Sequence, residues 1–155
     1  MAYMKWGDDL SVGVPMFDRE HNGLVKIINR LHRGLVQNAD HALLREIGAE
    51  LVEFTVLHFK HEEMYFHDFP YAGAEAHIAK HAAIKKQIRS YYQLIDAQHR
   101  AELGFELLAF VRDWWSHIRD VDREFGSLFS AHHAVSRDGT AVFASSFTSR
   151  RSLRR

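Results

Sequence analysis

The chain contains 155 residues, of which 46% are hydrophobic and 26% are charged, a composition typical of one globular domain. Its 20 basic and 20 acidic residues cancel, so no overall field favours nucleic acid or an anionic membrane as a partner. Because there is no cysteine, disulfide frameworks, thiolate zinc sites and cysteine-ligated iron–sulfur clusters are excluded.

The hydrophobic pattern predicts an all-α protein, since no alternating strand pattern competes with the helical periodicity. Gly7, Gly13 and Pro15 discourage helix formation, so residues 1–17 are expected to form an extended arm. Asp18 is expected to cap the first helix. Helices are expected at about residues 18–37, 41–66, 74–98 and 101–129. Long helices joined by short loops favour antiparallel neighbours, which indicates an up-down-up-down four-helix bundle.

The composition changes after the expected bundle. Residues 134–155 contain five arginines against one aspartate, with isolated Phe143 and Phe147. This pattern indicates a basic, flexible tail following a bundle domain at 1–133, with docking to an acidic partner or a membrane surface as the alternative. No run reaches the roughly eighteen apolar residues of a membrane span, and the N-terminus lacks a signal-peptide core. A cytoplasmic protein without a transmembrane segment is therefore expected.

Side chains that bind metals recur on each of the four expected helices. They are His21, His58 with Glu62, His77 with His81, and His117 with a following aspartate. The two pairs spaced by four residues each direct both side chains toward one side of their helix. Imidazole suits iron, zinc, copper or nickel, and a carboxylate can bridge two ions. The sequence therefore predicts a metal site in the core of the bundle.

Spacing leaves two positions of this set open. His61 lies only three residues after His58, so its spacing does not exclude it as a ligand. Asp120 follows His117 by three residues, a rotation of about 60° on an α-helix, whereas Asp122 follows by five, about 140°. Helix geometry alone therefore favours Asp120 over Asp122.

The same residues resemble the hemerythrin family, specifically its bacterial single-domain members, the bacteriohemerythrins. The similarity covers about residues 6–126. Its motifs are Trp6, Gly13, Asp18-Arg-Glu-His21, His58-Phe-x-x-Glu62-Glu63, His77-x-x-x-His81 and His117-Ile-x-x-x-Asp122. Each short motif is weak alone, but all four histidine motifs in order, one per helix, make a specific signal. The family pattern selects Asp122 over Asp120 and leaves His61 outside the ligand set.

The resemblance implies a pair of non-haem irons, Fe2+ or Fe3+, joined by a bridging oxo or hydroxo group. The implied ligands are His77, His81 and His117 for one iron, His21 and His58 for the other, and Glu62 and Asp122 as bridges. The iron with two histidines keeps an open position, so the implied function is reversible O2 binding for transport, storage or delivery, and not enzymatic catalysis. A monomer is expected, with an oxygen-consuming enzyme as a candidate recipient of the O2.

Other functions are weighed against this interpretation. An O2 or nitric oxide sensor, or an iron-handling protein, is the alternative on the same fold. A ferritin-like di-iron enzyme is disfavoured because no glutamate has a histidine three residues later.

One departure from the family concerns packing at the site: the usual tryptophan four residues before His117 is replaced by Asp113, and Trp114 and Trp115 follow it. The pocket beside the irons is therefore expected to differ in shape.

Overall fold

A computed structural model describes residues 2–137, and within this range the chain is entirely helical apart from its arm and loops. The elements are η1 (Asp8–Leu10), α1 (Pro15–Val36), α2 (His41–Asp68), α3 (Ala74–Asp96), α4 (Arg100–His117), η2 (Ile118–Asp122) and α5 (Arg123–Arg137). The short η1 is a 3-10 turn, and η2 is a π-helical segment. The predicted all-α fold class is confirmed. Residues 138–155 of the predicted tail lie outside the described range.

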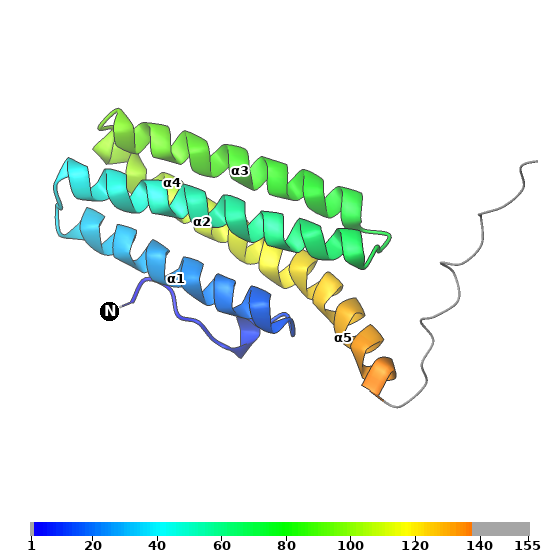
Figure 1. Ribbon diagram of the computed structural model, residues 1–155. Coiled ribbons are helices and arrows are strands. Elements are labelled where there is room, and N and C mark those ends of the chain that lie inside the picture. The colour runs from blue at the N-terminus through cyan, green and yellow to red at the C-terminus, as the bar shows by residue number, and fades with distance from the viewer. Residues whose placement is uncertain (1, 138–155) are drawn as a thin grey trace, which may run out of the picture.

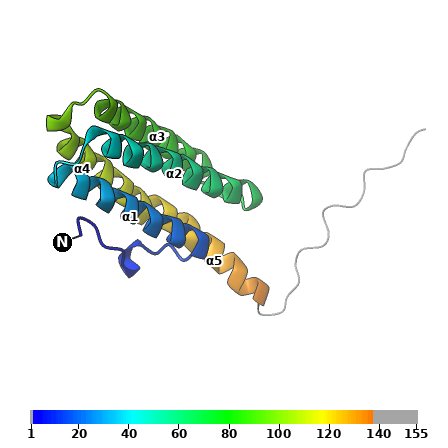
Figure 2. The same ribbon diagram turned by 60° about the vertical axis from the view of Figure 1, so that its left-hand side comes forward.

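The four long helices form an antiparallel bundle in which chain direction alternates from each helix to the next (Figure 1). α2 packs between α1 and α3, and α4 closes the bundle against α3 and α1. α4, η2 and α5 follow one another as a single rod, and α5 extends beyond the end of the bundle (Figures 1 and 2). The predicted fourth helix at 101–129 is therefore interrupted by a π-helical segment and continues further than expected.

The N-terminal arm lies along α1 and is fixed to it (Figure 2). Asn29 donates to the backbone carbonyl of Met4 and accepts from its amide, both at 2.8 Å. Asp18, predicted to cap α1, instead lies within its first turn, because the helix already begins at Pro15. Its carboxylate accepts from the backbone amide of Val12 at 2.8 Å. The prediction of Asp18 as a helix cap was wrong, since this carboxylate ties the arm to the helix.

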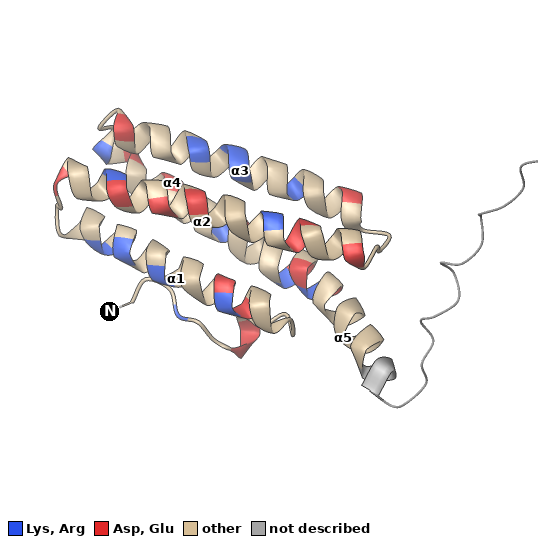
Figure 3. Ribbon diagram, viewed as in Figure 1, with Lys and Arg blue, Asp and Glu red and all other residues tan. Residues whose placement is uncertain are grey.

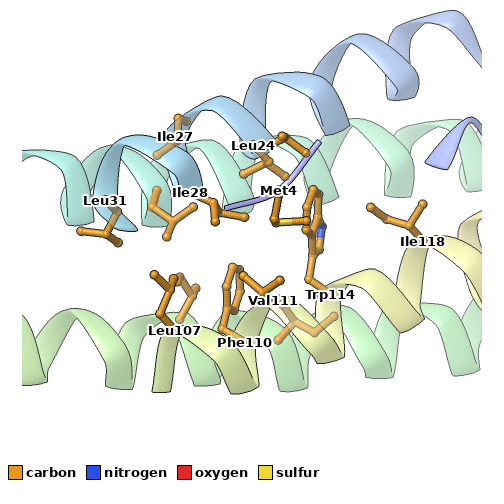
Figure 4. Packing of buried hydrophobic residues seen from close by; sticks show 14 of the residues in the cluster. Met4, Leu24, Ile27, Ile28, Leu31, Leu107, Phe110, Val111, Trp114 and Ile118 are labelled. Atoms are coloured by element: carbon orange, nitrogen blue, oxygen red, sulfur yellow. The ribbon is translucent and has the colours of Figure 1, made fainter. Parts of the chain in front are cut away.

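The core is apolar in one half of the bundle, whereas the other half combines buried aromatic residues with buried polar ones. Figure 4 shows the apolar half, where Leu24, Ile28 and Leu31 of α1 face Leu107, Phe110 and Trp114 of α4. Of the eight buried polar or charged residues in the described range, all but Thr55 belong to the set of predicted metal ligands. Burying polar groups is costly unless they are paired, so this concentration requires a specific explanation.

The surface carries charges of both signs along the bundle helices, without a long stretch of one sign (Figure 3). No helix within residues 2–137 combines the length and apolarity needed to cross a membrane. The mixture of charges on the bundle surface does not favour a polyanion as its partner.

Candidate metal centre

The structure brings all seven predicted ligand residues together in two overlapping groups. We call one the three-histidine group, which consists of His77, His81 and His117 with Glu62 and Asp122. We call the other the two-histidine group, which consists of His21 and His58 with the same two carboxylates. Within each group the nitrogen and oxygen ligand atoms all lie within 4.8 Å of one another. Because the groups share both carboxylates, they form one continuous cluster.

Asp122 contacts both groups through different oxygens. Its Oδ1 lies 2.8 Å from His77 Nε2 and 2.9 Å from His117 Nε2, both in the three-histidine group. Its Oδ2 lies 3.3 Å from His21 Nε2, in the two-histidine group. A carboxylate that presents one oxygen to each group is arranged to bridge two ions.

Glu62 divides its oxygens in the same way. Its Oε2 lies 3.0 Å from His81 Nε2, on the three-histidine side. Its Oε1 lies 3.2 Å from His58 Nε2 and 3.7 Å from His21 Nε2, on the two-histidine side. The two carboxylates therefore span the same gap between the groups, one from α2 and one from the α4–α5 rod.

The π-helical segment η2 explains why Asp122 reaches the site and Asp120 does not. In a π turn the backbone bond runs from residue i to i+5, as from Ile118 to the amide of Arg123, and residues five apart come to lie on one side. Asp122 follows His117 by five residues and is fully buried. Asp120 is exposed and accepts hydrogen bonds from Arg119 and Ser116. The expectation from regular helix geometry was wrong because the helix is locally wider.

Outer partners hold three of the five imidazoles by their second ring nitrogen. Nδ1 of His58 lies 2.8 Å from Glu20, that of His81 lies 3.0 Å from Glu63, and that of His77 lies 2.6 Å from the hydroxyl of Tyr71. Such partners fix the ring orientation and tautomer of a metal-binding histidine. Sequence spacing gave no signal for the outer partners Glu20, Glu63 and Tyr71, because the histidines that they contact lie on other helices or across a loop.

His61, which spacing left open, belongs to this outer layer. Its Nδ1 lies 2.5 Å from Glu20 Oε1, the carboxylate that also contacts His58, and its side chain is 27% exposed. It is not a member of either ligand group. Glu20 thus joins a buried ligand-type histidine to one at the surface.

Burial and charge set the protonation states of the cluster. Burial lowers the pKa of His58 to about 4 and that of His81 to about 2, so both are neutral at pH 7, as metal binding requires. Burial also opposes the charged form of His21, but Asp122 and Glu62 outweigh it and raise its pKa to about 9. Burial opposes ionisation of Asp122, yet the surrounding imidazoles hold its pKa well below the usual range. Burial and the charge of Asp122 raise the pKa of Glu62.

The atoms at the centre of the cluster fit a bound cation. Several of them lie close to one another without making a hydrogen bond among the described residues: Nε2 of His21, His58 and His81, both oxygens of Glu62, and Oδ2 of Asp122. Buried polar atoms left unpaired are costly, and a cation between them would satisfy them together. Imidazole nitrogens combined with carboxylate oxygens are donors that suit iron and related transition metals.

Comparisons with known proteins agree with this geometry. A family model described as the hemerythrin HHE cation binding domain matches residues 12–129. A bacteriohemerythrin of Pseudomonas aeruginosa PAO1 is 32% identical over 137 residues, covering 88% of this chain and 86% of the relative. One from Methylococcus capsulatus is 29% identical over 133 residues, covering 84% of this chain and all of the relative. A crystal structure of wild-type hemerythrin matches with a TM-score of 0.73 and 27% identity, covering 81% of this chain and 97% of that one.

Proposed function

Because the chain belongs to the hemerythrin family, we propose that it binds O2 reversibly at a pair of non-haem irons in the bundle core. The observation that carries this proposal is the pair of overlapping ligand groups that share Glu62 and Asp122. A single-ion site needs one such group, whereas two groups joined by shared carboxylates suit two adjacent ions.

In this proposal the three-histidine group holds one iron and the two-histidine group holds the other. The iron pair would supply two electrons to O2 on binding and recover them on release. The two-histidine group offers fewer protein ligands, so His21 and His58 would hold the metal on the side left accessible to O2. No catalytic turnover is part of this function.

The chain contributes a dry and oriented environment. All seven side chains of the cluster are at most 4% exposed, and the buried side chains of Leu24, Phe59 and Ile118 lie in the same core. Phe59 stacks on His81 with ring centres 4.0 Å apart. Exclusion of water protects a reduced metal centre from irreversible oxidation, and outer partners such as Glu20 keep the imidazoles in place.

The proposal is tested by loading the full chain with iron, reducing it without air and then admitting O2 while visible absorbance is recorded. We expect about two irons per chain and a charge-transfer band that appears with O2 and disappears when O2 is removed. Substantially fewer irons, or oxidation that cannot be reversed by removing O2, would contradict the proposal. Storage, delivery and sensing all require this reversible step, so the experiment precedes any assignment among them.

A further inference from the structure

Trp114 presents a buried hydrogen-bond donor that the packing of the bundle leaves unused. Its side chain is 0% exposed, and its indole Nε1 has no hydrogen-bond partner among the described residues. The indole nitrogen can only donate, and buried tryptophans usually find an acceptor for it. A phenylalanine or leucine would fill a core without creating this unmet requirement. The unpaired donor therefore indicates an acceptor that the protein side chains themselves do not provide.

The indole lies beside the two-histidine group. Its ring centre is 5.9 Å from that of His21, with the ring planes at 75°. Trp6 of the arm also lies beside His21, with ring centres 6.3 Å apart. On the three-histidine side Phe59 stacks on His81 and Phe66 packs against His77, and the hydroxyl of Tyr71 already contacts His77 Nδ1. The one indole buried in the core thus stands on the side with fewer protein ligands.

The direction of the donor agrees with this placement. In Figure 4 the indole nitrogen lies on the side of the ring toward Ile118 and away from Phe110 and Leu107. Ile118 begins η2, which also carries Asp122. Trp115, the next residue, differs because it borders an open hollow beside the arm, where water can accept its N–H.

We propose that Trp114 is a ligand-selecting residue: its indole N–H donates a hydrogen bond to a small ligand bound at the two-histidine metal. The favoured ligands carry negative charge or partial negative charge on the atom away from the metal, as O2 does once electrons have moved toward it, and as azide does permanently. A buried donor favours such ligands over neutral, weakly polar ones of similar size, because hydrogen bonds to charged acceptors are the stronger class. This inference rests on the proposed iron site.

The first test measures azide affinity of the iron-loaded, oxidised full chain by titration of its absorbance. We expect Trp114→Phe to raise the dissociation constant for azide by roughly tenfold to a hundredfold, the range for losing a hydrogen bond to a charged group. Trp115→Phe is the matched control and should change it less than about twofold, within the range of a surface substitution. Unchanged or tighter azide binding by Trp114→Phe would overturn the proposal, since the indole would then only fill space.

A second measurement does not depend on replacing Trp114. The chain has three tryptophans, so the Trp6→Phe, Trp115→Phe double variant retains Trp114 as its sole indole. Ultraviolet resonance Raman bands that report hydrogen bonding of the indole N–H should shift when azide is added to this iron-loaded variant. An unshifted spectrum at saturating azide would contradict the proposal even if Trp114→Phe lost its iron.

These outcomes separate the role of Trp114 from the proposed function. If the wild-type chain holds two irons but does not release O2, reversible O2 binding fails while the azide comparison still tests the indole. If the wild-type chain cycles O2 and the azide results do not depend on Trp114, only the ligand-selecting role fails.

Discussion

The two halves of the metal centre share both carboxylates but are supported by different surroundings. In the three-histidine group, Phe59 and Phe66 pack on the imidazoles, and Tyr71 and Glu63 hold two of them from outside. In the two-histidine group, tryptophans replace the phenylalanines beside His21. Each group keeps one histidine without an outer partner on Nδ1 among the described residues, His21 in the one and His117 in the other. The halves therefore differ in their aromatic lining, with phenylalanines on the imidazoles of one group and indoles beside His21 in the other.

The largest effect is expected where the halves meet. Asp122→Asn keeps the size of the side chain but removes the charge that faces both groups, so we expect loss of more than half of the bound iron. Total iron per chain after desalting measures this. His32→Ala is the control, because His32 stacks on Tyr3 at 4.0 Å and belongs to neither group. Full iron content in Asp122→Asn would mean that the carboxylate does not bridge.

Acid should destabilise the iron-free protein through imidazoles in both halves. His58 and His81 have lowered pKa values of about 4 and about 2, so below pH 6.5 the unfolded chain takes up protons that the folded chain does not. Between pH 6.5 and pH 5 each of these imidazoles lowers the free energy of unfolding by about 2 kcal/mol, since one proton taken up only by the unfolded chain changes it by about 1.4 kcal/mol per pH unit. Glu62, whose pKa is raised by burial and by the charge of Asp122, opposes part of this loss, because over this pH range the folded chain holds a proton on it that the unfolded chain does not.

We therefore expect the free energy of unfolding to fall between these two pH values, by less than the roughly 4 kcal/mol that the two imidazoles would cost alone. Urea unfolding in the presence of a chelator measures it. His21 has the opposite sign, because its pKa is raised to about 9 and its contribution is lost only as pH rises from 6.5 toward 9. Stability that increased toward pH 5 would contradict the neutral assignment of His58 and His81.

The arm over the two-histidine half can be displaced by one methyl group. A Cβ on Gly126 would lie 1.9 Å from the carbonyl oxygen of Val12, a backbone atom that cannot move without lifting the arm. Gly126→Ala should lower the free energy of unfolding by about 1–3 kcal/mol, the usual range for overpacking. Gly104→Ala is the matched control in α4, since nothing lies within 4 Å of its added Cβ. It should stabilise the protein by about 0.5–1 kcal/mol. Equal effects of the two substitutions would show that the arm does not pack closely on Gly126.

The outer carboxylates offer a smaller and more selective test. Glu20→Gln should weaken metal binding in the two-histidine half, and Glu63→Gln in the three-histidine half, each by roughly tenfold to a hundredfold. Competition with a metal chelator, followed over two binding phases, measures the change. If both variants weaken the same phase, the two groups are not separate sites.

The sequence predicted the helices and the ligand set to different degrees. Periodicity predicted four helices because apolar residues recur every three or four positions. In the structure Asp40 caps α2, where its carboxylate accepts from the backbone amide of Leu43 at 2.8 Å. Asp18 looked like a cap of the same kind, but the extended arm brings Val12 within reach of its carboxylate. The choice of partner depended on a contact that no local pattern encodes.

The aspartate of the last motif shows the same limit at the site. Regular helix geometry selects Asp120, and only the wider turn of η2 places Asp122 inside the bundle. Resemblance to a family selected Asp122, which the structure places in the cluster, without giving the reason for that spacing. The outer partners Glu20, Glu63 and Tyr71 were beyond the reach of spacing, since each is set by the packing of one segment against another.

Anomalous diffraction at the iron edge from crystals of the iron-loaded protein tests the central claim most directly. Two iron peaks are expected, one among His77, His81 and His117 and the other beside His21 and His58, with Glu62 and Asp122 between them. A single peak, or two peaks that do not share both carboxylates, would contradict the two-group account of the centre.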